Sequence, residues 1–293
     1  MPQLSIARWL ARRRLPFLHA LGGFLGWCAW WASPGYRRLL AENARRGGVT
    51  PAQRRQAISE AGRMLAELPW LWLRPHDDAR LAGGCRWHGE ALIEQGLAAG
   101  RGLLVLTPHM GSFEVCAQAY AERFGHLAPA TVLYRPARQD WLRDLQRRGR
   151  ERPGMKAAPA SLAGVRQMLK ALRAGETVGL LPDQVPPEGL GVWAPFFGHP
   201  AYTMTLAHRL VRQTGAAVVL MWCERLPRGR GHVLHVSAPA EPLDRVADDE
   251  LAAASAINRE MERVIAQCPG QYLWGYDRYK HPRGLPGIFG SVA

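Results

Sequence analysis

Short apolar runs alternate with amphipathic helical segments from about residue 100 onward, and this alternation constrains the fold more than any other feature. Short apolar runs bounded by turn residues are typical of buried strands, whereas apolar residues three and four apart form one face of a helix. The pattern predicts strands at residues 103–107, 131–134, 177–181, 216–222 and 233–236. Strands that alternate with helices predict an α/β fold with a largely parallel or mixed central sheet flanked by helices.

The helices that this fold requires are also marked in the sequence. One is expected at residues 161–174, and a longer one between Asp248 and Pro269. A third helix is expected at residues 51–69. Pro51 marks its start, because proline is favoured in the first turn of a helix, and Pro69 marks its end, because proline interrupts a helix further along. The apolar residues 70–73 follow it, and they are expected to extend a membrane-facing surface.

A histidine and a glutamate five positions apart, His109 and Glu114, follow the first of these strands. Residues five apart do not share a helix face, but Pro108 interrupts the chain before them. We therefore place His109 in a loop, Ser112 at the N-cap of the next helix and Glu114 in its first turn. There the helix dipole favours an ionised Glu114, which would orient the imidazole so that His109 can take a proton from an alcohol. On spacing alone, an ordinary loop histidine and a helix-terminal acid remain the alternative.

Two further polar residues follow predicted strand ends. Arg135 comes after residues 131–134, and Asp183 comes after residues 177–181. Because ligands of open α/β sheets gather at the carboxyl ends of the strands, we expect both residues to meet His109 in one cleft. Arg135 would grip a phosphate, and Asp183 would position Arg135 or cap the following turn. A turn arginine and a loop aspartate are the structural alternatives.

The chain is strongly basic. Its 293 residues are 47% hydrophobic, which supports a full core in one large or two modest domains and excludes a disordered protein. The formal net charge of +14 and the pI near 10.4 point to an anionic partner, such as nucleic acid, anionic lipid, a phosphorylated substrate or an acidic carrier protein. For any single arginine cluster, a solvated basic surface is the simpler interpretation.

The cysteines argue against a disulfide framework or a zinc ribbon, because they are dispersed and odd in number, at positions 28, 85, 116, 223 and 268. They indicate a reducing compartment. His232 and His235 bracket a predicted strand, but no third ligand lies near them in the sequence, so no metal site is predicted.

Residues 15–31 are apolar except for His19 and include three tryptophans, at positions 27, 30 and 31. This length is at the short limit for crossing a bilayer, and arginines flank it on both sides, as at membrane interfaces. We expect a membrane anchor at residues 1–40 and an α/β catalytic domain at residues 41–293. A cleaved signal peptide is disfavoured by the bulky tryptophans and the reduced cysteines, and a short core helix is the remaining alternative.

Five motifs, in this order, resemble those of the late acyltransferases of lipid A biosynthesis, the lauroyl and myristoyl transferases. The resemblance extends from roughly residue 10 to residue 283, and the motifs are Pro108-His-Met-Gly-Ser-Phe-Glu114, Tyr134-Arg-Pro136, Pro182-Asp-Gln184, Ala194-Pro-Phe-Phe-Gly198, and Tyr272-Leu-Trp274 with Arg278-Tyr-Lys280. The chain departs from the family where an asparagine often follows Tyr-Arg-Pro, since it has Arg138, Gln139 and Asp140 there. The loop that contacts the acceptor is therefore expected to differ.

The resemblance implies that His109 and Glu114 form the catalytic pair and that Arg135 contacts the substrate. Ser112 and Asp183 are also candidate substrate-binding residues. The resemblance further implies acyl carrier protein as donor, a phosphorylated glycolipid as acceptor, no cofactor, and a place on the cytoplasmic face of the Gram-negative inner membrane. Two alternatives stay open: an acyltransferase for another lipid acceptor, and a basic membrane-tethered protein that binds nucleic acid. The sequence contains no recognisable nucleic-acid-binding module that would favour the second alternative, so nucleic acid is not an expected partner.

Overall fold

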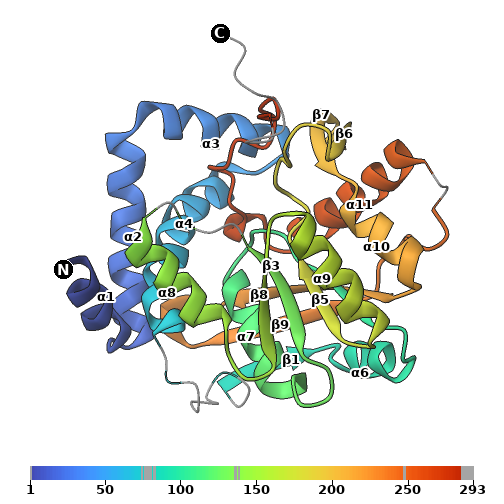
Figure 1. Cartoon of the computed structure of the whole chain (residues 1–293). Helices are drawn as coiled ribbons and strands as arrows, with labels where there is room; N and C mark the ends of the chain where they lie inside the picture. Colours follow the sequence, from blue (N-terminus) through green and yellow to red (C-terminus); the bar gives the residue numbers. More distant parts are fainter. Residues whose placement is uncertain are drawn as a thin grey trace, which may run out of the picture.

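A seven-stranded sheet forms the centre of the molecule (Figure 1). The computed structural model describes residues 2–73, 75, 81, 84–134, 137, 139–246 and 249–284. The sheet strands are β1 (Cys85–His88), β2 (Leu103–Leu106), β3 (Ala130–Tyr134), β4 (Met155–Pro159), β5 (Thr177–Leu180), β8 (Ala217–Arg225) and β9 (His232–Ser237). Their order across the sheet is β1-β9-β8-β2-β5-β3-β4.

The sheet is mixed but mostly parallel. The neighbours β8, β2, β5, β3 and β4 all run parallel to one another. Only the pairing of β8 with β9 is antiparallel, and β1 then runs parallel to β9. The α/β fold with a largely parallel or mixed sheet is therefore confirmed.

Helices cover both faces of the sheet. The main ones are α6 (Ala91–Ala98), α7 (Phe113–Phe124), α8 (Asp140–Arg150), α9 (Leu162–Arg173), α10 (Leu206–Thr214) and α11 (Glu250–Ile265). In β2, Leu104 and Leu106 pack into a core with α9, α10 and α11, whereas Leu103 and Val105 pack into a second core with α6 and α7. All four side chains are buried, which is why this strand is a continuous apolar run.

All five strands predicted from the sequence are present, but four further ones are not predicted: β1, β4 and the separate hairpin of β6 (Gly191–Phe196) and β7 (His199–Met204). The hairpin turn places Phe197 and Gly198 at φ values of 47° and 73°. Positive φ at both turn residues matches the twist of the paired strands, and glycine adopts it readily. Prolines in these strands hid the hairpin in the sequence.

The helix α4 (Pro51–Trp72) continues beyond the predicted end at Pro69. One further turn forms there, and Leu73 N donates to the Pro69 carbonyl. In this turn Leu71 and Trp72 are buried in the second core. The expectation that residues 70–73 extend a membrane-facing surface is therefore wrong for Leu71 and Trp72, because both side chains are buried. The helix continues past Pro69 because packing of this turn against the core outweighs the backbone hydrogen bond that proline cannot donate.

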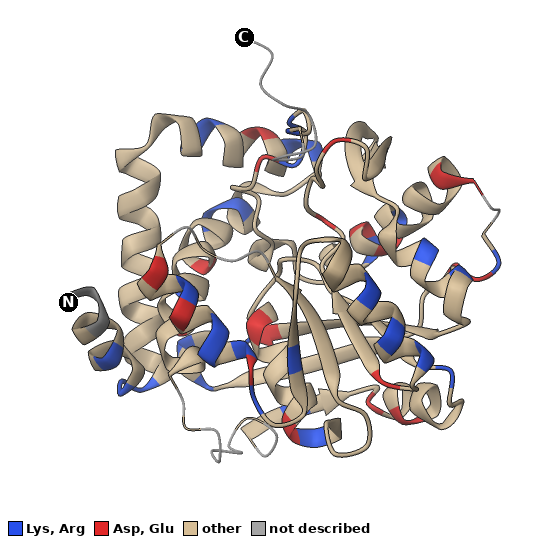
Figure 2. Ribbon diagram, viewed as in Figure 1, with Lys and Arg blue, Asp and Glu red and all other residues tan. Residues whose placement is uncertain are grey.

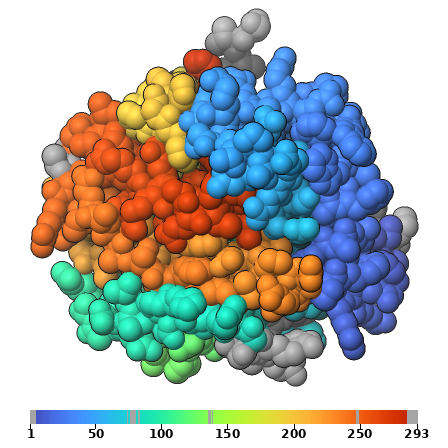
Figure 3. Space-filling view, turned by 180° about the vertical axis from the view of Figure 1, so that it is seen from behind, coloured from blue at the N-terminus to red at the C-terminus, as the bar shows by residue number. Residues whose placement is uncertain are grey.

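The amino-terminal helices α1 (Pro2–Ala11), α2 (Leu15–Ala32) and α3 (Pro34–Arg46) pack against the body of the protein. Gly22 and Gly26 of α2 lie so close to α4 that a Cβ on Gly62 would be 2.0 Å from the Gly22 carbonyl oxygen. Figure 3 shows these segments adjoining the carboxyl-terminal part of the chain. Among the described residues, no helix combines the length and apolarity needed to cross a bilayer. The membrane anchor and the domain division at residue 40 stay predictions.

Candidate active site

Backbone hydrogen bonds hold the loop after β2 on both sides. Gly111 N donates to the Gln271 carbonyl (2.9 Å), and Leu273 N donates to the His109 carbonyl (3.1 Å). Gly111 has a φ of 58°, and a Cβ there would lie 1.9 Å from the Cys223 carbonyl oxygen, so the turn requires glycine. His109 is thus fixed between the end of β8 and the chain near residue 272.

The carboxylate that hydrogen-bonds His109 is that of Asp183. Nδ1 of His109 lies 2.8 Å from Oδ1, and the backbone N of His109 donates to Oδ2 at 2.8 Å. The two residues follow β2 and β5, which are adjacent and parallel, so their carboxyl ends lie at one edge of the sheet. The structure therefore brings together two of the three residues expected at this edge.

Asp183 determines which nitrogen of His109 carries a proton. Burial alone would raise the pKa of the Asp183 carboxyl, but the charge of His109 and its hydrogen bonds hold that pKa below its usual value. Asp183 is therefore ionised at neutral pH and accepts the Nδ1–H of the imidazole. The lone pair of the neutral ring then lies on Nε2, the nitrogen that a general base uses.

The rest of the His109 ring contacts two neighbours. Nε2 lies 3.0 Å from Nε2 of Gln184. The Phe113 ring, at the start of α7, lies with its centroid 4.8 Å from that of the imidazole. The sequence analysis did not identify Gln184, although it directly follows Asp183 in one of the quoted motifs.

Glu114 has other partners than His109. It forms an ion pair with Arg150 of α8 and accepts from Trp72 Nε1 (3.3 Å). The expected orientation of the imidazole by Glu114 is therefore corrected, because the bonded carboxylate is that of Asp183. Glu114 does lie in the first turn of α7, as expected, but that turn faces α4 and α8. Spacing in the sequence could not reveal that these helices supply a cation and an indole.

Ser112 occupies the N-cap position of α7, but its hydroxyl makes no capping bond. The hydroxyl instead donates to Oε2 of Glu67 (2.7 Å). Only 2% of Ser112 is exposed, so its side chain belongs to a buried network. The expected role of Ser112 in substrate binding stays a prediction. The third strand-end residue, Arg135, lies outside the described residues, directly after the end of β3.

A buried cluster of charged residues lies beneath the loop. Arg225 donates through Nε and Nη2 to both carboxylate oxygens of Glu67 (2.9 Å each) and through Nη1 to Glu60 (2.6 Å). Nε2 of His19, on α2, lies 2.6 Å from Glu67, and Nε2 of His232, on β9, lies 3.3 Å from it. One carboxylate thus joins five segments of the fold. Two glutamates seven apart, and therefore on one face of the helix predicted at residues 51–69, were the signal for it.

Electrostatics keeps Glu67 charged. Burial would raise the pKa of Glu67, but the Arg225 guanidinium and the hydrogen bonds from His19 and His232 hold it well below its usual value. The ligand atoms of His19, Glu67 and His232 lie within 4.8 Å of one another, a spacing that a metal ion can bridge. Both oxygens of Glu67 are already bonded to Arg225, whose charge would repel a cation. We therefore interpret the cluster as an ion-pair network.

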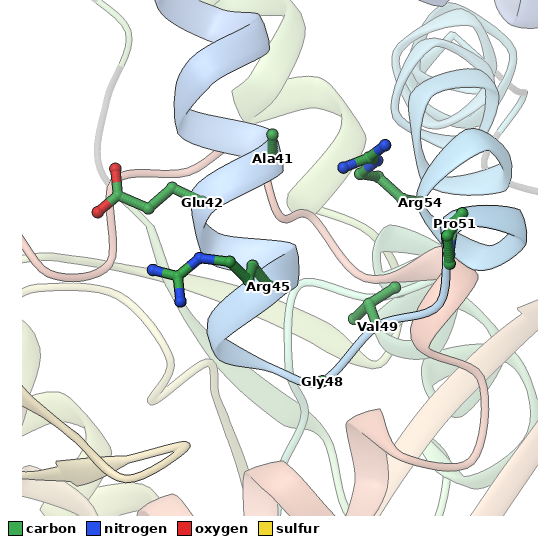
Figure 4. A pocket seen from close by; sticks show the side chains of 7 residues that line it. All are labelled: Ala41, Glu42, Arg45, Gly48, Val49, Pro51 and Arg54. Atoms are coloured by element: carbon green, nitrogen blue, oxygen red, sulfur yellow. The ribbon is translucent and has the colours of Figure 1, made fainter.

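A cavity of about 370 Å³ lies at the turn between α3 and α4 (Figure 4). Its lining residues are Ala41, Glu42, Arg45, Gly48, Val49, Pro51 and Arg54. None of the predicted site residues lines it. It is an open surface hollow, and the hydrogen-bonded side chains around His109 are the better candidate for chemistry.

Comparisons with known proteins agree with the motifs. The family model described as bacterial lipid A biosynthesis acyltransferase matches residues 4–281. The chain belongs to this acyltransferase family. It is 31% identical over 232 residues to the lipid A biosynthesis lauroyltransferase of Escherichia coli (strain K12), and the matched region covers 78% of this chain and 71% of that protein. The palmitoleoyltransferase of the same strain is 28% identical over 254 residues (86% and 75%). A lipid A biosynthesis acyltransferase of Haemophilus influenzae is 27% identical over 244 residues (83% and 70%).

In this acyltransferase the carboxyl-terminal motif residues lie beside Asp183. The Tyr272 hydroxyl hydrogen-bonds Asp183, and its pKa is well above the usual value because the group is buried and faces that carboxylate. Arg278 is buried, donates to the Tyr202 carbonyl (2.7 Å), and its charge helps to lower the pKa of Asp183. The motifs that contain His109, Asp183 and Tyr272 with Arg278 are thus far apart in the sequence but lie together in the fold.

Proposed function

We propose that this acyltransferase moves a fatty acyl chain from acyl carrier protein to a hydroxyl of a lipid A precursor. The single observation that carries the mechanism is the pair of hydrogen bonds from His109 to Asp183, which leaves the Nε2 lone pair as a base. Family membership supports the lipid A precursor as acceptor. The strongly basic surface, with Lys and Arg spread over the outer helices (Figure 2), suits a phosphorylated lipid and an acidic carrier protein.

In this mechanism His109 acts first as a base and then as an acid. Nε2 takes the proton of the acceptor hydroxyl while the oxygen attacks the carbonyl carbon of the thioester. The tetrahedral intermediate collapses with cleavage of the C–S bond, and the imidazolium gives its proton to the leaving sulfur. Asp183 holds the ring and stabilises its positive charge. No oxidation state changes, so the transfer needs no redox cofactor.

Two further roles are proposed for charged residues of the chain. Glu114, paired with Arg150, would hold a cation near the end of β3, where Arg150 also lies 5.8 Å from the Tyr134 ring centroid. Arg135, the next residue after Tyr134, would bind a phosphate or polarise the thioester carbonyl. Both groups are proposed to act on the substrate and not on the imidazole.

Mass spectrometry tests the function. In cells that lack the gene for this protein, we expect restoring the gene to increase the mass of lipid A by one acyl chain. A gene that encodes the His109→Ala variant should leave the mass of lipid A unchanged. Purified protein should transfer the chain from acyl carrier protein to the precursor in vitro. A chain gained by a phospholipid or aminolipid, with lipid A unchanged, would support the alternative acceptor. Binding to nucleic acid without transfer would support the non-enzymatic alternative, which the family match disfavours.

Exposed apolar side chains on the amino-terminal helices support a membrane-facing surface, which we propose lies on the cytoplasmic side of the inner membrane. Phe17, Phe24 and Trp31 are spaced by seven residues along α2, so they form one stripe, and they are 44%, 67% and 66% exposed. Trp9 of α1 joins the stripe by an edge contact with Phe17 (5.6 Å). A stripe of this kind, flanked by arginines, is typical of helices that lie in the membrane interface.

A double variant with both Phe24→Glu and Trp31→Glu should bind anionic phospholipid vesicles about 100-fold more weakly, since each aromatic side chain buried in the bilayer contributes roughly a factor of ten to the affinity. Flotation with vesicles measures it. Leu162→Glu, at a 72% exposed site on α9, is the matched control and should bind as the parent does. Equal binding of all three proteins would exclude this surface. Deleting the segment is a poorer test, because it also removes His19 from Glu67.

A further inference from the structure

The nitrogen of His109 that should receive the acceptor proton already has a hydrogen-bond partner. Nε2 of His109 lies 3.0 Å from the amide nitrogen of Gln184. An amide nitrogen only donates, and the Nδ1–H bond to Asp183 leaves Nε2 of the neutral ring as an acceptor. The two assignments agree, so Gln184 donates to the lone pair that the reaction uses.

A substrate hydroxyl would need the same position. A general base takes a proton from a group within about 2.6–3.2 Å of it, and the Gln184 amide lies in that range. The single lone pair of Nε2 accepts one strong hydrogen bond in the plane of the ring. The hydroxyl and the Gln184 amide therefore compete for one site.

Gln184 can leave this site without disturbing the fold. Its side chain is half-buried, whereas that of the neighbouring Asp183 is 2% exposed. The backbone beyond it is held separately, because Val185 N donates to the Tyr276 hydroxyl (2.9 Å). Among the described residues, the bond to His109 is the one that an amide rotation of Gln184 would break.

We propose that Gln184 is a displaceable cap on the catalytic base, which occupies the place of the acceptor hydroxyl until the acceptor binds. The inference rests on the proposed role of His109 as general base. Gln184 then acts through His109 as a positioning residue: it occupies the lone pair of Nε2, and the cost of displacing it lowers the apparent affinity for the acceptor.

Chemical modification tests the cap without any substrate. Diethyl pyrocarbonate acylates the free lone pair of a neutral imidazole, so the modification rate of the peptide that contains His109, followed by mass spectrometry, reports how often Nε2 is uncapped. Gln184→Ala should raise this rate roughly 3- to 10-fold, the change expected when one neutral hydrogen bond is lost. The exposed His199 in the same sample gives the reference rate, and Gln95→Ala, an exposed site on α6, is the matched control.

Kinetics should move in the same direction. Gln184→Ala should lower KM for the acceptor by a similar factor and change kcat little. Gln184→Glu, which has the same shape, should place a carboxylate beside Nε2 and hold a proton there. That variant should be modified at least 10-fold more slowly and should lose at least 10-fold in kcat/KM.

An unchanged modification rate in Gln184→Ala would show that no cap exists. A loss of kcat in Gln184→Ala as large as that in His109→Ala would overturn the proposal too, because Gln184 would then act in the transition state. Faster modification with no acyl transfer to any acceptor would support the cap and reject the proposed function, so the two failures are distinguishable.

Discussion

Replacing His109 with alanine should lower acyl transfer by at least about 100-fold, the usual contribution of a positioned general base. Asp183→Asn should cost a comparable factor, because an amide no longer enforces the Nδ1–H tautomer and cannot stabilise the imidazolium. Initial rates with purified variants and acyl carrier protein as donor measure both effects. Thermal unfolding must be followed alongside, since Asp183 also bonds the backbone of the loop.

Double variants identify which carboxylate serves the imidazole. If Asp183 acts through His109, the variant that combines His109→Ala with Asp183→Asn should be about as slow as His109→Ala alone, because residues that act as a unit are strongly non-additive. Glu114→Gln, the matched control, removes a carboxylate that pairs with Arg150. Its effect should multiply with that of His109→Ala. The reverse result, with Glu114 non-additive and Asp183 multiplicative, would refute the assigned pair.

The second large effect concerns stability. Glu67→Gln should lower the free energy of unfolding by about 3–5 kcal/mol, because it leaves Arg225 buried with half of its ion pairs. Thermal or denaturant unfolding measures the loss. Glu42→Gln, which removes an ion pair whose acid is 43% exposed, should cost less than about 1 kcal/mol. A loss in Glu67→Gln no larger than in this control would contradict the structural role of the cluster.

The pH dependence of stability gives an independent measurement. The folded-state pKa of Glu67 is well below its usual value, so the ionised group stabilises the fold at neutral pH. This contribution should be lost as the pH falls below about 4, from the unfolded pKa toward the folded one. Below that pH, Glu67→Gln should lose stability less steeply than the parent protein. Parallel curves would mean that Glu67 ionises alike in the folded and unfolded chains.

Local patterns were sufficient for much of the fold. The five apolar runs predicted as strands are strands, because each crosses the buried sheet and must be apolar on one or both faces. The helix at α9 is amphipathic, with Met168 and Leu172 buried on its inner face. The position of His109 and Asp183 at the carboxyl ends of their strands also followed from the sequence, since parallel neighbours end at the same edge.

Contacts between distant segments were not predictable in this way. His109 and Glu114 are close in the sequence, yet each finds its partner elsewhere: Asp183 after β5 for the histidine, and Arg150 on α8 for the glutamate. Spacing restricts where a side chain can point, but it does not identify what another element brings to that place. The same reason explains Ser112, whose hydroxyl bonds to Glu67 and not to its own helix.

The sequence by itself determined the α/β class, the strand and helix positions near the site and the family, because hydrophobic periodicity and ordered motifs are properties of short segments. Only the tertiary structure decided that Asp183 orients His109, that Gln184 covers its free nitrogen, and that α2 reaches the buried cluster through its own histidine. These contacts join residues between 48 and 75 positions apart. Burial makes them specific, since a buried polar group must find a partner wherever the chain supplies one.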